Sequence, residues 1–360
     1  MKILNKGEKM KAITLDLADG KPIVGMRDMP IPKIAPDEVL VEVKAVSICG
    51  TDISVANYIS SMRNRIKEFP HILGHEFAGY IVDIGSNVVK WKIGDYISAE
   101  THIYCGNCPT CERGDNHLCP NLKLLGVDCN GCFAEYIAVP EKVLNRNNIF
   151  LPLYLASIQE PLGNAVYCVN EANVKGKNIL IIGDGPAALF VVAVSKIFRA
   201  SDITIFGYNE YRLQIAEKIG ASSINSDKNC VDFINEFIGE NDGGLFDVVF
   251  EMTGSEPGIN TAINACHPGG KIMVFGLAKD SLATVPYNKI ALKGITAQGI
   301  YGRQMWSSWD LVKILLNDSD FVKIMESIVT HKLPFAEWQK GFDLMMKTKD
   351  CGKVVLLMEE

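Results

Sequence analysis

The sequence predicts an α/β protein that combines a β-rich first domain with a doubly wound parallel sheet. Two observations predict this fold class. Short alternating segments with glycine and proline breaks fill the first 150 residues, and apolar strands alternate with helical runs from Asn178 onward. Such alternation is typical of a parallel sheet with helices on both faces. The 360 residues are enough for two domains with separate cores.

The β-rich domain is expected to consist of short strands joined by tight turns. The segment DEVLVEVKAVSIC alternates apolar and polar residues from Val39 to Val46, which is the pattern of a half-buried strand. HEFAGYIVDIGSNV and GDYISA, which begin at His75 and Gly94, continue this pattern of short predicted strands. The first domain therefore reads as a set of strands with little helix.

The second domain is expected to alternate strands and helices. NILIIG, ITIFG, FDVVFEMTG and KIMVFG are its predicted strands, and helices are expected between them, one closed by Gly220. We assign residues 164–302 to this domain. Helical runs from about Arg303 and a last strand, KVVLLM, are expected to return to the first domain, which then comprises residues 1–163 and 303–360.

The composition excludes several classes of protein. The formal net charge is −6, with no basic block and no apolar run of 18 residues, so neither a nucleic-acid partner nor a membrane span is expected. The first residues hold lysines but lack the apolar stretch of a signal peptide. Eleven cysteines are many and odd in number. We therefore expect a cytoplasmic protein whose cysteines are metal ligands or small core residues.

The glycine-rich stretch GDGPAA, from Gly183 to Ala188, directly follows the NILII strand and opens the next helix. Gly183 and Gly185 allow a tight turn and the close approach of a pyrophosphate, which then lies at the helix N-terminus. Ala188 occupies the third position of the fingerprint, where alanine is permitted. In this strand–turn–helix context the motif predicts a Rossmann domain that binds a dinucleotide. The alternative is a glycine turn in an ordinary α/β domain.

The end of the second strand of this domain predicts which dinucleotide binds. An acidic residue there reads the ribose 2′-hydroxyl of NAD, but ITIFG ends in Gly207, and Arg212 follows a short distance later. The sequence therefore predicts NADP(H) in preference to NAD(H). The alternative is a solvated Arg212 and NAD(H) held by other contacts. The residues predicted to bind the cofactor are Gly183, Gly185, Pro186, Ala187, Gly207, Tyr208, Asn209, Arg212, Thr253 and Gly276.

Four cysteines in the loop CGNCPTCERGDNHLC have the spacing of a closed metal site. They are Cys105, Cys108, Cys111 and Cys119. Four thiolates complete a tetrahedral zinc and leave no open position for water or substrate. The loop is therefore predicted to hold a structural zinc, with an iron–sulfur cluster or free thiols as the alternatives.

A reaction needs a metal with an open position, and the candidate ligands for it lie far apart in the sequence. They are Cys49 in SICGTD, His75 and Glu76 in GHEFAG, and Glu160 in QEPLGNAV. A thiolate, an imidazole and a carboxylate leave zinc one open position. Spacing alone does not bring these residues together. Each also has an ordinary structural alternative, as a core thiol, a turn histidine or a carboxylate at a helix N-terminus.

The order of these motifs resembles that of the zinc-dependent medium-chain dehydrogenase/reductase family, which includes the alcohol dehydrogenases. CGTD, GHE, the four-cysteine loop, EPLGNAV and the glycine-rich turn follow one another over nearly the whole chain. The resemblance implies a GroES-like β-rich catalytic domain beside the Rossmann domain. It also implies hydride transfer between an alcohol and a nicotinamide, without a nucleic acid or a membrane as partner.

The resemblance assigns roles to individual residues. Cys49, His75 and Glu76 match the ligands of a catalytic zinc, and Glu160 matches a further carboxylate that binds this zinc or holds its water. Thr51 matches the hydroxyl that begins a proton relay. Together with the four-cysteine loop, these matches imply two Zn²⁺ ions per chain.

Within this family the chain is similar to the threonine dehydrogenases, in stretches such as SAETHIYCGNC, FAEYIAVP and IVTHK. This implies a small polar secondary alcohol like threonine as the substrate, a homotetramer or a dimer, and Glu100 and His102 near the substrate side of the metal. Two positions differ from that pattern. Gly207 replaces an acidic residue, and Ser54 replaces a relay histidine, so the relay is expected to end on Ser54, a water or the ribose.

Three other functions differ in how well they agree with the sequence. A polyol, 2,3-diol, hydroxy-phosphonate or sugar could be the substrate of the same site, which a substrate screen would separate. A non-catalytic nucleotide-binding member of the family would be expected to have lost the ligands of the open zinc site, and all of them are present. A zinc-ribbon nucleic-acid binder does not fit the net charge of −6.

Overall fold

The computed structural model describes residues 8–225, 245–278 and 282–359, and the chain divides into two compact units. The first unit comprises Met1–Pro161, Val329–Lys349 and Lys353–Glu360, and the second comprises Leu162–Ile328 and Asp350–Gly352. Residues 303–328, which the sequence analysis placed in the β-rich domain, lie in the second unit. There α12 (Ser319–Ile328) packs against α6 (Pro186–Ile197), which explains the difference.

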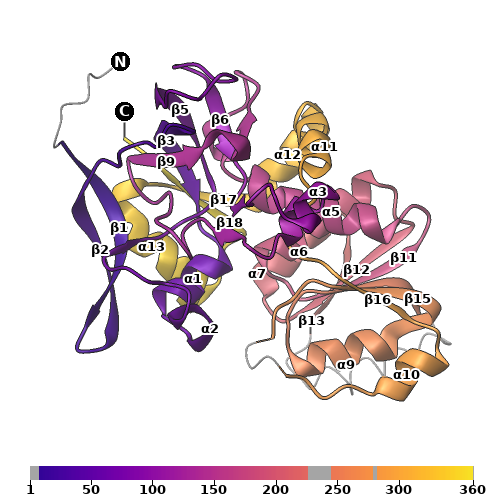
Figure 1. Ribbon diagram of the computed structural model, residues 1–360. Coiled ribbons are helices and arrows are strands. Elements are labelled where there is room, and N and C mark those ends of the chain that lie inside the picture. The colour runs from indigo at the N-terminus through magenta and orange to yellow at the C-terminus, as the bar shows by residue number, and fades with distance from the viewer. Residues whose placement is uncertain (1–7, 226–244, 279–281, 360) are drawn as a thin grey trace. The chain divides into compact units, whose positions relative to one another are not determined.

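The first unit is built on β-sheets (Figure 1). The hairpin of β1 (Lys9–Ala18) and β2 (Lys21–Pro30) is extended by β4 (His71–Ile72). A larger sheet has the order β10-β6-β5-β3-β18-β17, with β9 also paired to β3. Its strands are β3 (Glu38–Ser47), β5 (Phe77–Ile84), β6 (Tyr96–Ala99), β9 (Tyr136–Pro140), β10 (Leu144–Arg146), β17 (Val329–Pro334) and β18 (Lys353–Leu357).

Strand β3 is the predicted DEVLVEVKAVSIC strand, and it is more buried than the alternating pattern indicated. It pairs with β5, β9 and β18, so it lies inside the sheet, and residues on both of its faces are buried. The remaining elements of this unit are short. They are β7 (His102–Ile103), β8 (Lys123–Leu124), α1 (Gly50–Ala56), α2 (Ser60–Arg63), α3 (Pro109–Glu112), α4 (Leu153–Ala156) and α13 (Trp338–Asp343).

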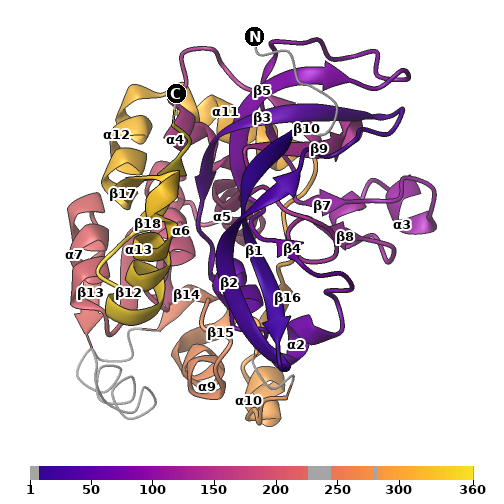
Figure 2. The same cartoon turned by 90° about the vertical axis from the view of Figure 1, so that its left-hand side faces the viewer.

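The second unit contains the predicted parallel sheet, in the order β13-β12-β11-β14-β15-β16. Figure 1 shows α6 on one face of this sheet and α9 and α10 on the other, and Figure 2 shows α7 beside β13. The strands are β11 (Asn178–Ile182), β12 (Asp202–Gly207), β13 (Ser222–Asn225), β14 (Phe246–Glu251), β15 (Cys266–Val274) and β16 (Thr296–Gly299). The other helices are α5 (Gln159–Ala172), α7 (Glu210–Ile219), α9 (Glu256–Ala265), α10 (Tyr287–Leu292) and α11 (Ser307–Leu316).

The strands of the second unit are apolar because both faces of the sheet are covered. Leu180, Ile182, Val249 and Ile272 are buried in one cluster on this sheet. Helix α7 ends at Gly220, which has a left-handed conformation with φ 116° and caps the helix as predicted. In the part of the chain that the structure describes, no helix has both the length and the apolar character needed to cross a membrane.

Candidate zinc centres and nucleotide-binding turn

The four cysteines of the loop converge as their spacing predicts. Their Sγ atoms are 3.5 Å apart for Cys108–Cys111 and Cys105–Cys119, and 3.9 Å apart for Cys105–Cys111 and Cys108–Cys119. A tetrahedral zinc with Zn–S distances of about 2.3 Å has sulfur atoms about 3.8 Å apart, so this arrangement fits zinc. All four are free thiols rather than disulfides. The cluster is closed, because its four thiolates supply all four ligands.

Local structure explains why these thiols point inward. Cys108 is the N-cap of the short helix α3, Cys111 lies within α3, and Cys119 follows a 3-10 helix over residues 116–118. Gly106 and Gly114 have φ of +87°, which allows the loop to reverse twice around its centre. The loop therefore owes its shape to turns and to the four thiols rather than to a core of its own.

A second cluster joins three of the four candidate ligands of the open site. Ligand atoms of Cys49, His75 and Glu76 all lie within 4.8 Å of one another. Cys49 is the N-cap of α1, just after β3, and the other two directly precede β5. Strands β3 and β5 are antiparallel partners, with Val46 opposite Phe77. This register brings together residues that the sequence spacing leaves apart.

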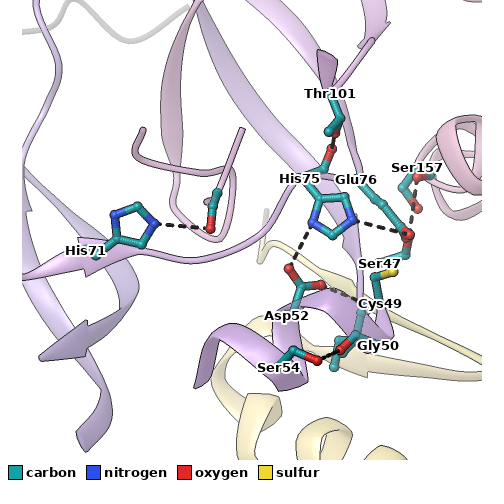
Figure 3. Close-up of polar contacts among 12 residues, drawn as sticks. Ser47, Cys49, Gly50, Asp52, Ser54, His71, His75, Glu76, Thr101 and Ser157 are labelled. Atoms are coloured by element: carbon teal, nitrogen blue, oxygen red, sulfur yellow. Dashed lines mark hydrogen bonds and ion pairs between the residues drawn. The ribbon is translucent and has the colours of Figure 1, made fainter. Parts of the chain in front are cut away.

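Asp52 holds both the imidazole of His75 and the backbone of Cys49 in this cluster. Its Oδ1 is 3.0 Å from His75 Nδ1, and its Oδ2 accepts the backbone N–H of Cys49 at 2.8 Å (Figure 3). The Nε2 atom of His75 is thereby turned toward Glu76, with its Oε1 at 3.9 Å. Burial lowers the pKa of His75, but the charge and hydrogen bond of Asp52, with a contribution from Cys49, raise it well above the usual range. A carboxylate on the far ring nitrogen is the usual outer partner of a metal-bound histidine.

Glu76 carries a buried ion pair that the sequence did not predict. Its Oε2 is 2.6 Å from Lys353 Nζ, and both side chains are almost fully buried. Ser47 also donates a hydrogen bond to Glu76, and Lys353 donates a second one to the carbonyl of Ile48. Burial lowers the pKa of Lys353, whereas the charge of Glu76 raises it, and the net shift is upward. The signal available in the sequence was a lysine opening the otherwise apolar strand KVVLL.

The remaining predicted residues of this site lie close in sequence or on neighbouring elements. Thr51 is half-buried in the first turn of α1, two residues after Cys49. Ser54 donates its hydroxyl to the carbonyl of Gly50 at 3.1 Å, so that proton is engaged within its own helix (Figure 3). Glu160 is buried near the start of α5, and the three-residue cluster of ligand atoms does not include it.

Glu100 and His102 are both buried in the first unit. Glu100 Oε1 accepts the backbone N–H of His102 at 2.9 Å. Thr101, between them, donates its hydroxyl to the carbonyl of His75 at 2.9 Å. That hydrogen bond ties the segment 100–102 to the backbone of the cluster.

The glycine-rich turn of the second unit has the geometry expected for a pyrophosphate. Gly183 has φ +111°, and Gly185 is the N-cap of α6, with Pro186 as its first residue. A Cβ on Gly185 would meet nothing within 4 Å, so there is open space at the start of a twelve-residue helix. Free N–H groups and the positive end of the helix dipole favour an anion there.

Two more predicted cofactor residues lie next to this turn. A Cβ on Gly183 would be 3.1 Å from Thr253 Cγ2, and one on Gly276 would be 2.1 Å from the backbone nitrogen of Gly254. The carboxyl ends of β11, β14 and β15 thus meet at one edge of the sheet. Glu251, which the sequence analysis missed, is buried at the end of β14. Its carboxylate accepts the N–H of Thr253 at 2.9 Å and that of Gly254 at 3.1 Å, and thereby shapes this edge.

The structure does not support the prediction of NADP(H) that was based on Arg212. Arg212 is 6% exposed, and its Nε donates to the carbonyl of Cys351 at 2.7 Å. Asp184, the second residue of the glycine-rich turn, lies against Gly207 and accepts the backbone N–H groups of Tyr208 and Asn209. The premise that no carboxylate lies at the end of the second strand is therefore wrong, because the turn after the neighbouring strand β11 supplies one.

Comparison with known proteins gives matches to both parts of the chain. Residues 35–147 match the family described as alcohol dehydrogenase GroES-like domain, and residues 186–316 match the family described as zinc-binding dehydrogenase. An L-threonine 3-dehydrogenase of Caldanaerobacter subterraneus subsp. tengcongensis is 42% identical over 326 residues, which is 91% of this chain and 93% of the relative. One from Bacillus subtilis is 40% identical over 350 residues, 97% of this chain and 99% of the relative.

Among solved structures, a short chain alcohol dehydrogenase from E. coli CFT073, complexed with NADH, has a TM-score of 0.86. The alignment covers 98% of this chain and 100% of that one at 24% sequence identity. At this level of identity the likeness shows the fold alone.

Proposed function

The chain belongs to the zinc-binding alcohol dehydrogenase family with a GroES-like domain, and from this premise we propose that it oxidises L-threonine or a similarly small, polar secondary alcohol. It is an oxidoreductase that acts on CH–OH groups. The observation that carries the proposal is the convergence of Cys49, His75 and Glu76 within 4.8 Å, in a chain 40–42% identical to threonine dehydrogenases. The proposed reaction transfers a hydride from the alcohol carbon to a nicotinamide.

The donor set of the open cluster fits a catalytic zinc. Thiolate, imidazole and carboxylate are all zinc ligands, and a set of three leaves one position for the substrate oxygen. A zinc ion held there would supply Lewis-acid chemistry, which lowers the pKa of a bound hydroxyl. Cys49 and His75 Nε2 would hold it, and Asp52 keeps the imidazole in the required orientation.

Glu76 and Glu160 are both proposed as carboxylates of this centre, in different situations. Glu76 is neutralised by Lys353, so its negative charge is already compensated before any metal binds. Glu160 is buried without belonging to the cluster of ligand atoms, which fits the role of holding a water rather than that of a direct ligand.

The proton of the substrate hydroxyl is proposed to leave through Thr51. Thr51 lies in the first turn of α1, two residues after Cys49. Because Ser54 donates its own proton to Gly50, the relay beyond Thr51 is proposed to run through a water or the ribose rather than through Ser54. Such a relay contributes about 10²–10⁴-fold to general acid–base steps.

The proposal is tested by mixing zinc-loaded protein with L-threonine and following the absorbance of reduced nicotinamide, with NAD⁺ and NADP⁺ in parallel. The matched pair of variants is Cys49→Ala and Cys129→Ala, since both thiols are half-buried but only Cys49 belongs to the cluster. Turnover that Cys129→Ala retains and Cys49→Ala loses is the expected result. Turnover of a polyol or 2,3-diol without turnover of threonine would assign the enzyme to that other class of substrate. Silence with every secondary alcohol, from protein that holds zinc, would overturn the proposal.

A further inference from the structure

A carboxylate from the turn after β11 lies at the end of strand β12. β11 and β12 are parallel, with Ile182 opposite Phe206, so the turn after β11 lies beside the last residues of β12. Asp184 is the second residue of that turn. Its Oδ2 accepts two backbone hydrogen bonds, from Tyr208 and Asn209, each at 2.8 Å.

Gly207 and Asp184 depend on each other. A Cβ on Gly207 would lie 2.5 Å from Asp184 Oδ2 and 2.7 Å from its Cβ, distances that real Cβ atoms do not show. The missing side chain at Gly207 is therefore the space that the Asp184 side chain fills. An acidic residue at position 207 and one at position 184 exclude each other, and this chain has the second arrangement.

The charges around this carboxylate favour a hydroxyl over a phosphate. Asp184 is 7% exposed, and the nearest guanidinium nitrogen, Arg212 Nη1, is 4.0 Å from its Oδ1. Arg212 itself is held away by Cys351, which accepts from Nε through its carbonyl at 2.7 Å and lies 3.7 Å from Nη2 through its sulfur. Arg212 is thus a buried structural cation, and its guanidinium is not free to pair with a phosphate. Within the described residues, Oδ1 of Asp184 accepts no hydrogen bond.

We propose that Asp184 reads the adenosine ribose in place of an acid at the end of the second strand, so that the chain binds NAD(H) in preference to NADP(H). An acid at this edge accepts a hydrogen bond from the ribose 2′-hydroxyl. A 2′-phosphate carries about −1.5 to −2 charges, and a buried carboxylate repels it with little screening by salt. This inference rests on the proposed function, because it requires a nicotinamide dinucleotide at the glycine-rich turn.

The test is a binding titration, without alcohol, of NADH and NADPH into the zinc-loaded protein, read by calorimetry. The wild type is expected to bind NADH at least about tenfold more tightly than NADPH. Asp184→Asn keeps one oxygen that can accept both N–H groups but removes the charge, so the ratio of the two affinities is expected to fall by about tenfold or more. Asp202→Asn makes the same change of net charge at the exposed, opposite end of β12 and is expected to leave the ratio unchanged.

A second variant tests the exchange of positions directly. In Asp184→Gly/Gly207→Asp the carboxylate moves to the strand end, and the three atoms nearest to the new Cβ, all from the Asp184 side chain, are gone. Asp184→Gly alone is expected to lose the NADH preference, and the double variant is expected to regain it. Thermal melts of each variant establish that the chain is folded.

Three results would overturn the inference. They are a wild type that binds NADPH as tightly as NADH, a folded Asp184→Asn with an unchanged ratio, and a chain that binds neither nucleotide. The first two leave the proposed dehydrogenase intact, since its test is turnover of an alcohol. Only the third also removes the proposed function. Conversely, a chain that is silent with threonine but shows the expected ratios keeps the role of Asp184.

Discussion

The four-cysteine cluster and the Cys49–His75–Glu76 cluster each gather their ligand atoms within 4.8 Å, but they are assembled in opposite ways. The first is made by one loop, residues 105–119, whose turns and short helix aim every thiol inward. The second is made by the register of β3 against β5. Spacing in the sequence can therefore predict a closed set of ligands, whereas the convergence of an open set depends on how strands pair.

The two clusters also differ in what surrounds them. Each of the four cysteine sulfurs lies 3.5–3.9 Å from others of the set, and Cys119 Sγ also accepts the backbone N–H of Cys105 at 3.4 Å. In the open cluster the ligands are held by residues outside the set: Asp52 holds His75 and the backbone of Cys49, and Lys353 holds Glu76. A closed site of identical ligands stabilises a loop, while an open site whose ligands are held by outer residues keeps its geometry when one position is left for a substrate.

The largest difference between the clusters is expected in catalysis. Cys49→Ala is expected to lower turnover by at least about 10³-fold, because Lewis-acid stabilisation is worth several kcal/mol, while the melting temperature changes little. Steady-state rates and a thermal melt measure both quantities. The comparison would break if Cys49→Ala held no zinc at the Cys49–His75–Glu76 cluster and still kept more than about a tenth of the wild-type rate.

The buried partner of Glu76 is expected to matter next. Lys353→Met leaves a fully buried carboxylate without its cation, which costs about 3–5 kcal/mol in the free energy of unfolding of the zinc-free protein. Lys347→Met is the control, because the pair of Lys347 with Asp343 is exposed and contributes little. Urea unfolding midpoints compare the two. Equal midpoints would show that Glu76 is not held by Lys353.

The sequence predicted the parallel sheet, the glycine-rich turn and the four-cysteine loop, because each depends on residues that are close together in the chain. NILII followed by GDGPAA is a strand, a turn and a helix in order, and the structure has β11 and α6 at these places. The family resemblance supplied Cys49, His75 and Glu76, which spacing did not bring together. The register of β3 against β5 supplies the physical reason for their convergence.

What the sequence could not show was which side chains compensate or replace one another across strands. Lys353 is far from Glu76 in the chain, and only the pairing of β18 with β3 brings it near. Gly207 was taken as an absent acid, although its missing Cβ makes room for Asp184. Arg212 was taken as a free cation, although the segment Asp350–Gly352 returns to the second unit and captures it. All three depend on contacts between distant segments.

The closed cluster is expected to affect stability rather than chemistry. Cys105→Ala opens the tetrahedral set, and the melting temperature is expected to fall by on the order of 5–10 °C, because zinc binding to a structural site contributes to folding. The rate per zinc-loaded molecule at low temperature is expected to stay within about threefold of the wild type. Cys168→Ala controls for loss of a buried thiol outside both clusters. A Cys105→Ala chain as stable as the wild type would contradict the structural assignment.

The smallest effect is expected from Asp52→Asn, which should change the zinc affinity of one cluster and not that of the other. Asp52 accepts one hydrogen bond at each carboxylate oxygen, from His75 and from the backbone of Cys49, and an asparagine side chain has only one acceptor oxygen. Loss of such an outer partner typically weakens metal affinity by about 10–100-fold. Chelator competition should therefore show zinc lost more readily from the Cys49–His75–Glu76 cluster, while zinc bound to the four-cysteine cluster keeps its affinity. Asp28→Asn changes the charge equally at an exposed pair with Lys11 and should release neither. If Asp52→Asn weakened both zincs alike, the two clusters would be coupled, and the independence inferred from their separate assembly would be lost.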